Sequence, residues 1–232
     1  MIRRRHIAGR ADRTDRRAEE RARRREQMLD AAERIAAAVG WDSLTMIEVA
    51  EQSRVSRALV YLYFRSKAAL RLAIAERAVW RLSRRLADAV HQQARGVDQL
   101  LAIVRVCLAE AGMSAARTLV AAHRETPSPT PDLRLGESTF RAGVESCRYT
   151  ISGALELGIR DGSIPPDVGA ARTVAALLWE FICGVVLLRG PAPEPGSDRP
   201  DATSAVSELA LQFVERCVRH FAPPISLQAQ AH

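Results

Sequence analysis

Apolar residues recur along almost the whole chain at the 3.6-residue spacing of an α-helix, and this period limits the fold more than any other feature. The first stripe runs from Met28 to Val39 and stops at Gly40, which predicts a helix over residues 26–39 with a glycine stop. No segment shows the alternation of β-branched residues that a half-buried strand requires. The sequence therefore predicts an all-α fold of about nine helices.

The remaining helices are placed by their apolar periods, by capping residues and by breakers. Ser66 can cap a long helix, and the prolines of 126–131 and of 191–201 predict breaks. We expect Gly158 to close the helix before the turn IRDGSIPP. The further predicted helices cover residues 45–53, 57–64, 67–94, 97–111, 114–125, 132–158, 167–189 and 203–221.

Residues 173–188, TVAALLWEFICGVVLL, are the one segment that resembles a membrane span. They are apolar except for Glu180, but 16 residues fall short of the roughly 20 that a spanning helix needs. We therefore predict a helix buried between other helices and no membrane partner.

Four cysteines, Cys107, Cys147, Cys183 and Cys217, lie far apart in apolar segments. They form no CxxC pair and have no histidine at the spacing of a metal site, so we expect buried, reduced thiols and no bound metal. The N-terminus has no apolar signal segment, and together these features predict a cytoplasmic protein.

Positive charge is concentrated at the N-terminus. Residues 1–25 hold eleven Arg against four acidic residues, whereas the rest of the chain is neutral. Such an arm suits a polyanion, either nucleic acid or an acidic membrane surface. A membrane-binding helix needs an apolar face, which this segment lacks. We expect the arm to be flexible, either disordered or marginally helical, and to contact DNA phosphates or the minor groove.

Residues 46–65, MIEVAEQSRVSRALVYLYFR, have the spacing of a helix-turn-helix. Ala50 stands where the two helices must approach closely, and Val49, Val55 and Val60 form a small core between them. Two helices this short cannot bury their apolar faces alone. The helix predicted over 26–39 must therefore be the third member of a tri-helical unit.

Residues 26–75 as a whole closely resemble the DNA-binding domain of the TetR (tetracycline-repressor-like) family of bacterial transcription regulators. The resemblance rests on the LDAA opening, the step Gly40-Trp41, the Thr that starts the second helix, the Val-Ser turn, and the run YLYFRSK leading into AAL. It implies an arm at 1–25, a helix-turn-helix domain at 26–72, an effector-binding and dimerisation domain at 73–222, and a tail at 223–232. The implied function is a ligand-responsive regulator, by family habit a repressor.

The resemblance places the helix 57–64 in the major groove of DNA. There Arg57 would read a guanine, Ala58 and Leu59 would touch a thymine methyl, and Thr45 would clamp a phosphate. Lys67 places a positive charge at the N-terminal end of its own helix, where the helix macrodipole is also positive. A phosphate at this point would interact favourably with both the ammonium and the helix end. The complete predicted set of DNA-binding residues is Thr45, Arg57, Ala58, Leu59, Tyr61, Tyr63, Lys67, Arg23, Arg24 and Arg25. For Tyr63 the alternative is packing in the domain core.

Two residues depart from the family pattern. Arg54 stands where family members usually carry a glycine, because the residue after the second helix tends to adopt a positive φ. Leu62 stands where Arg or His is frequent. The helix 57–64 is therefore less polar than usual, and fewer hydrogen bonds to bases are expected.

Residues 167–189 are apolar on nearly all sides and 203–221 carry an apolar stripe, so two such helices from each protomer would form a four-helix homodimer interface. The alternative is a monomer with these helices at its centre. A homodimer would recognise a nearly palindromic double-stranded operator. If the helices are arranged as in the family that the chain resembles, a pocket for a hydrophobic or amphipathic effector would be lined by His123, Phe140, Trp179 and Cys183. No cofactor is expected.

Two alternatives to this function are an enzyme and an architectural DNA-binding protein. An enzyme could use His123, Glu125 and Asp132 as an acid/base set, but the sequence has no nucleophile elbow, phosphate loop or metal spacing, so we expect no enzyme. An architectural DNA-binding protein that takes no effector stays open. A helical body without a cavity would distinguish it.

Overall fold

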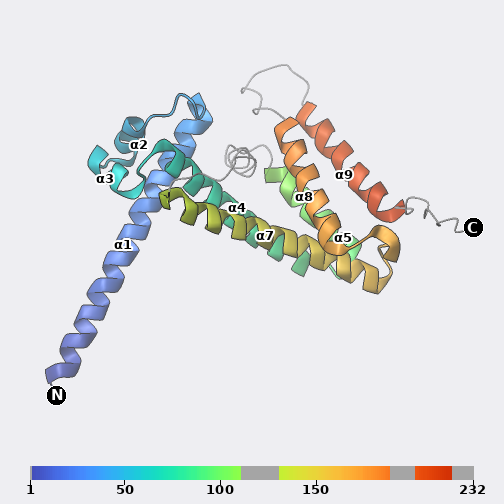
Figure 1. The fold of residues 1–232 in the computed structure, drawn as a ribbon, viewed down its shortest axis with the longest axis horizontal. Coiled ribbons are helices and arrows are strands. Elements are labelled where there is room, and N and C mark those ends of the chain that lie inside the picture. Colours follow the sequence, from blue (N-terminus) through green and yellow to red (C-terminus); the bar gives the residue numbers. More distant parts are fainter. Residues whose placement is uncertain (1, 111–130, 189–201, 221–232) are drawn as a thin grey trace, which may run out of the picture. The chain divides into compact units, whose positions relative to one another are not determined.

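The computed structural model describes residues 2–110, 131–188 and 202–220, and these ranges are helical without a strand. The all-α prediction is confirmed, and the described part divides into two compact units, Met1–Ile74 and Ala75–His232 (Figure 1). The helices are α1 (Ile2–Val39), α2 (Met46–Ser53), α3 (Arg57–Tyr63), α4 (Lys67–His91), α5 (Gly96–Glu110), α7 (Pro131–Asp161), α8 (Ala171–Leu188) and α9 (Ala202–His220). A 3-10 turn, Pro166–Val168, precedes α8.

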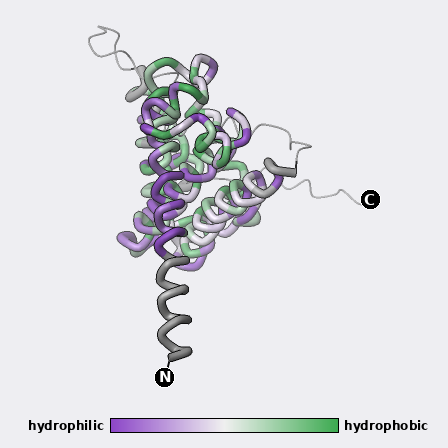
Figure 2. Tube along the Cα trace, turned by 90° about the vertical axis from the view of Figure 1, so that its left-hand side faces the viewer, coloured by the Kyte–Doolittle hydropathy of each residue, from purple (hydrophilic) through white to green (hydrophobic). Residues whose placement is uncertain are grey.

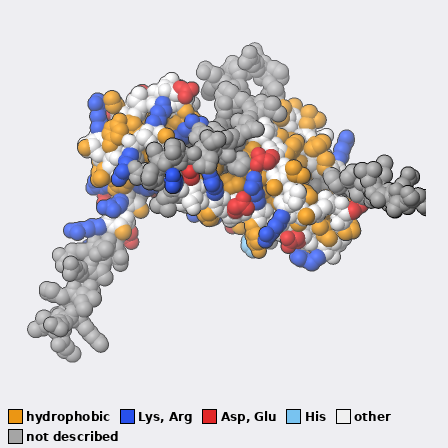
Figure 3. Space-filling view, viewed as in Figure 1, with side chains coloured by type: hydrophobic (Ala, Val, Ile, Leu, Met, Phe, Trp, Pro, Cys, Tyr) orange, Lys and Arg blue, Asp and Glu red, His pale blue; other side chains and the backbone are white. Residues whose placement is uncertain are grey.

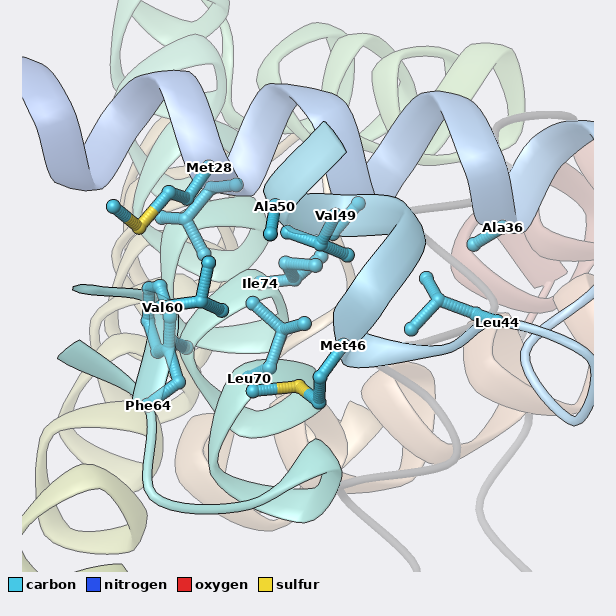
Figure 4. Close-up of a cluster of buried hydrophobic side chains, with 13 residues drawn as sticks. Met28, Ala36, Leu44, Met46, Val49, Ala50, Val60, Phe64, Leu70 and Ile74 are labelled. Atoms are coloured by element: carbon cyan, nitrogen blue, oxygen red, sulfur yellow. The ribbon is translucent and has the colours of Figure 1, made fainter. Parts of the chain in front are cut away.

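The first unit is built around one apolar cluster. Side chains from α1, α2, α3 and the start of α4 point toward one another in it (Figure 4). Met28, Val49 and Val60 are fully buried there, as are Leu70 and Ile74 of α4. The two short helices therefore bury their apolar faces only because α1 and α4 cover them, as the sequence predicts for α1.

Capping residues fix where the short helices begin. Thr45 caps α2 and forms a capping box with Glu48. The Ser56 hydroxyl accepts from the backbone N–H of Leu59 at 3.2 Å, and the Ser66 hydroxyl accepts from that of Ala69 at 3.1 Å. Gly40, with φ of +82°, ends α1. The predicted cap at Ser66 and the glycine stop at Gly40 are both confirmed.

The predicted start of the first helix at residue 26 is wrong, because α1 begins at Ile2 and includes the arginine-rich arm. The described segment ahead of the core is strongly hydrophilic (purple in Figure 2). Glu20 bonds to Arg23 and Arg24, three and four residues ahead. Local pairs of this kind favour a helix without any apolar face. The flexibility of the arm stays a prediction.

The second unit packs α5, α7, α8 and α9 against one another, together with the part of α4 from Ala75 onward. The Ser83 and Ser146 hydroxyls join α4 to α7 at 2.8 Å. The prediction that Gly158 ends its helix is wrong, because α7 continues to Asp161. A Cβ at Gly96 would clash with the backbone of Gly158, and a Cβ at Gly158 would clash with the side chain of Ile164. Gly158 therefore permits close packing rather than a helix stop.

Helix α8 packs one face into the second unit, while Leu177 on its other side is exposed, so the buried helix predicted for residues 173–188 is confirmed for one face only. Trp179, Ile182 and Val186 are buried. None of the described helices is long and apolar enough to cross a membrane. The helix predicted over 114–125, the loop 191–201, the tail 223–232 and most of the proline break 126–131 lie outside the described residues.

Candidate nucleic-acid interface

Helix α3 turns one face toward the core of the first unit and the other toward solvent. Val60 and the C-cap Phe64 are buried, and these two residues anchor the helix. The outward face carries four exposed residues spaced at i, i+1, i+4 and i+5, namely Arg57, Ala58, Tyr61 and Leu62. Three of the four belong to the predicted set, and Leu62 is the addition.

The two leucines of α3 occupy different environments. Leu59 is half-buried and packs against the core cluster, whereas Leu62 is 75% exposed. Leu62 is the most exposed large hydrophobic residue in the described part of the first unit. Leu62, one turn beyond Ala58, is thus the more exposed of the two leucines, and contact of Leu59 with DNA stays a prediction.

The two predicted tyrosines also separate. Tyr61 is 50% exposed on the outward face of α3. Tyr63 is half-buried and packs against the core cluster, with its ring centroid 6.4 Å from that of Phe64. The structure thus gives Tyr63 the core environment that was its alternative interpretation, while any contact of either hydroxyl with DNA stays a prediction.

Arg54 forms the turn between α2 and α3 in the left-handed conformation, with φ of 56° and ψ of 44°. It is the only non-glycine residue with a positive φ among the described residues. Its backbone N–H donates to the Ala50 and Glu51 carbonyls, which ends α2. The turn therefore keeps the geometry that glycine would favour, and it adds an exposed guanidinium next to α3.

Thr45 already has a partner for the groups that were predicted to clamp a phosphate. Its backbone N–H and its hydroxyl both donate to the Glu48 carboxylate at 2.8 Å. These bonds, the hydroxyl bond first, lower the pKa of Glu48. The carboxylate thus occupies the N-terminal end of α2, and a phosphate that binds there must displace it or share the Thr45 donors with it.

Lys67 donates from Nζ to the Asp42 carbonyl at 2.9 Å, which ties the start of α4 to the loop after α1. This bond is an intramolecular role that the sequence did not indicate, since the two residues lie 25 positions apart. An ammonium has three donors, so the remaining ones can still meet a phosphate.

The arginines at the end of the arm are partly engaged within α1. Arg23 and Arg24 pair with Glu20 at 2.6 and 2.7 Å, and these bonds, that to Arg24 first, lower the pKa of Glu20. The guanidinium of Arg25 lies 5.8 Å from the centroid of the Phe64 ring, a cation–π contact that joins α1 to the end of α3. All three predicted arginines thus lie on the helix that enters the core of the first unit.

The surroundings of α3 are positively charged. From Gln52 to Ala75 the chain carries five basic residues and no acidic one, the five being Arg54, Arg57, Arg65, Lys67 and Arg71. Figure 3 shows blue Lys and Arg side chains over the part of the surface that belongs to the first unit. An exposed helix with basic flanks is an electrostatic site for a polyanion.

In the second unit the residues predicted to line an effector pocket are buried. Phe140 on α7 and Trp179 and Cys183 on α8 are each at most 3% exposed, and His123 lies outside the described residues. Trp179 and Cys183 stand one turn apart on α8. Contact of any of these residues with an effector stays a prediction.

All four cysteines are free thiols, and three of them are buried while Cys217 is half-buried. Burial, together with the nearby Cys183, raises the pKa of Cys147 to about 12, and burial also raises the pKa of Cys107. Both thiols therefore stay protonated at neutral pH, as expected for core residues. Over the described residues, no group of three or more His, Cys, Asp or Glu is placed to hold a metal ion.

Helices α8 and α9 leave large apolar side chains at the surface of the second unit. Leu177 on α8 is 65% exposed, and Leu209 and Phe213 on α9 are 64% and 55% exposed. The Phe181 and Phe213 rings, with centroids 5.3 Å apart, join the two helices. We call Leu177, Phe181, Leu209 and Phe213 the α8–α9 face. An apolar face of this kind is typical of a protein interface.

Residues 28–74 match the family model described as "Bacterial regulatory proteins, tetR family". No curated protein sequence matches the chain. Among solved structures, AibR in complex with isovaleryl coenzyme A and operator DNA is similar, with a TM-score of 0.60 and 16% identity over 84% of this chain and 98% of that one. FadR from Bacillus subtilis in complex with stearoyl-CoA has a TM-score of 0.59 and 19% identity over 82% and 96%.

A regulator from Saccharomonospora viridis in complex with choline is a third similar structure, with a TM-score of 0.64 and 19% identity over 84% of this chain and 96% of that one. At these identities the likeness concerns the fold. All three comparisons extend over both units of the chain, whereas the family model covers part of the first unit alone.

Proposed function

Because this chain carries the DNA-binding domain of the tetR family of bacterial regulatory proteins, we propose that it is a cytoplasmic, ligand-responsive repressor that a small hydrophobic or amphipathic molecule releases from its operator. The observation that carries the DNA-binding half is the outward face of α3. It presents Arg57, Ala58 and Tyr61 to solvent within a segment that has five basic residues and no acidic one. A helix held this way fits the major groove.

The polar groups proposed to contact DNA each have a defined task. Arg57, in the first turn, bonds O6 and N7 of a guanine with its planar guanidinium. Tyr61 donates its hydroxyl to a phosphate or a base edge. Thr45, Tyr63 and Lys67 orient the domain on the backbone, Thr45 by exchanging the Glu48 carboxylate for a phosphate.

The arm contributes affinity rather than sequence recognition. As part of α1 it has the width of an α-helix, about 10–12 Å with side chains. The minor groove of B-DNA is only about 6 Å wide. A helical arm therefore lies along phosphates, and Arg23, Arg24 and Arg25 are its contacts nearest the core of the first unit.

The chain acts as a homodimer through the α8–α9 face. Leu177, Leu209 and Phe213 are largely exposed in one protomer, and a twofold axis would bury them against the same residues of a second copy. A twofold dimer carries two recognition helices and matches a nearly palindromic operator.

The effector would bind in the second unit. Solved proteins of this fold hold isovaleryl coenzyme A, stearoyl-CoA and choline, which supports a small organic effector without naming it. The buried Phe140, Trp179 and Cys183, with His123, are the proposed lining. Native mass spectrometry of protein from its own host, with operator-release assays on any bound molecule, tests this part. Linkage requires ligand and DNA to weaken each other by one and the same factor.

Arg57→Ala tests the reading role of α3. The variant should lose discrimination at one base pair per half-site, by roughly 1–3 kcal/mol, because the bidentate contact to guanine disappears. The measurement is the affinity for a selected operator, for its single-base variants and for random DNA. Arg34→Ala is the control, because Arg34 is an exposed arginine on α1 outside the α3 face. Equal weakening on operator and random DNA by Arg57→Ala would contradict the assignment.

A further inference from the structure

Leu62 is a large apolar residue, and its exposure to water is energetically unfavourable. It offers 75% of its surface to solvent on the outward face of α3, although Leu59 and Val60 of the same helix are packed into the core. Ala58, one turn earlier, is also exposed, so the two form an apolar strip on the recognition helix. Tyr61, 50% exposed, borders this strip.

The basic residues around this apolar strip favour DNA as the ligand that covers it. Arg57 and Arg65 flank it in the sequence, and the nearest acidic residues are Glu51 and Glu76. A protein partner that bound Leu62 alone would not require the basic residues around it. DNA does, because the phosphates beside the major groove are negatively charged.

Among the base edges of the major groove, the methyl group on C5 of thymine is the apolar feature. The side chains of Ala58 and Leu62 have no hydrogen-bonding atom, so they cannot read the donor and acceptor pattern of guanine or adenine. The four positions from Ala58 to Leu62 rise about 6 Å, which is roughly two base-pair steps when the helix axis follows the groove, so the two side chains face different base pairs.

On this basis, and given the DNA-binding function proposed above, we propose that Leu62 selects thymine in each operator half-site by covering its methyl group. The specificity of the chain is then divided between a polar contact from Arg57 at the start of α3 and an apolar contact from Leu62 near its end. Leu59 keeps a structural role in the core.

Replacing thymine by deoxyuridine removes this methyl group and leaves base pairing intact. A pool of random DNA is first selected with the wild-type protein. Each thymine of the enriched operator is then replaced by deoxyuridine at symmetry-related positions. Affinities are measured for the wild type, Leu62→Ala, Leu62→Met and Val39→Ala, the last being a control on α1 at a residue 52% exposed. Leu62 is at the surface, so these substitutions leave the core of the first unit intact.

At one position we expect deoxyuridine to weaken wild-type binding about fourfold per half-site, the equivalent of the roughly 0.8 kcal/mol of one buried carbon, and about 15-fold for both. Leu62→Ala should be insensitive to the replacement there, while Leu62→Met and Val39→Ala should keep the wild-type sensitivity. Equal sensitivity of Leu62→Ala and the wild type, or no sensitive position, would overturn the role of Leu62 while operator binding stands. Failure to enrich any sequence would instead overturn the proposed function itself.

Discussion

Leu177→Glu should convert the protein from a dimer to a monomer and abolish tight operator binding. Leu177 is 65% exposed in the single chain, so the charge does not disturb the protomer core. In the proposed dimer it would be buried twice across the twofold axis, and an uncompensated buried charge costs about 3–5 kcal/mol. We expect the dimer dissociation constant to rise by about 10³-fold or more, measured by analytical ultracentrifugation.

The loss of the dimer should also weaken binding to operator DNA. Two linked reading heads gain about 10²–10⁴ in avidity over one, and a monomer loses that gain. Gln92→Glu is the matched control, because it introduces the same charge at an exposed position after α4. It should stay dimeric and bind operator like the wild type. A Leu177→Glu protein that remained dimeric would place the interface elsewhere.

Deleting residues 1–24 should weaken binding to operator and random DNA alike. The deletion removes ten Arg and four acidic residues and leaves Arg25, which lies over the Phe64 ring. Each lost phosphate contact should lower the slope of log affinity against log salt by about 0.9, and several lost contacts should lower the affinity about 10²–10³-fold at moderate salt. Titrations of both DNAs at several salt concentrations measure this effect.

Glu20→Gln provides a control of opposite sign. Its carboxylate pairs with Arg23 and Arg24, so the amide should free both guanidinium groups and steepen the salt dependence. If the deletion abolished specific binding alone and left random DNA unaffected, the arm would read the minor groove, and the phosphate interpretation would be wrong.

The helix-turn-helix was largely predictable because its signals are local. The cap at Thr45 and the breaks around Gly40 and Arg54 fix the end of α1 and both ends of α2 within a few residues. The predicted turn was right even though Arg54 replaces the usual glycine. Local geometry of this kind depends on neighbours in the sequence.

The sequence could not decide which leucine of α3 faces outward. A helix of seven residues makes only two turns, and Leu59 and Leu62, three positions apart, both fit a plausible apolar side. The packing of the whole tri-helical unit settles the question by placing Leu59 against its core. The bond from Lys67 to the Asp42 carbonyl is equally non-local.

Tertiary packing also explains why the prediction of a helix end at Gly158 was wrong. Gly158 precedes a turn and resembles a helix stop, but it is needed where Gly96 and Ile164 approach α7. The start of the first helix was predicted wrongly for a local reason. Its helix depends on charge pairs such as Glu20–Arg24 and has no apolar stripe for periodicity to detect.

Hydroxyl-radical footprinting of the dimer on a selected operator tests the central claim most directly. Two recognition helices related by a twofold axis must enter successive major grooves on one face of the duplex. The predicted result is two symmetric protected half-sites on one face, with centres about 34–36 Å apart, or about one helical turn. A single asymmetric half-site, or uniform protection independent of sequence, would contradict the claim that this chain is a dimeric, sequence-specific regulator.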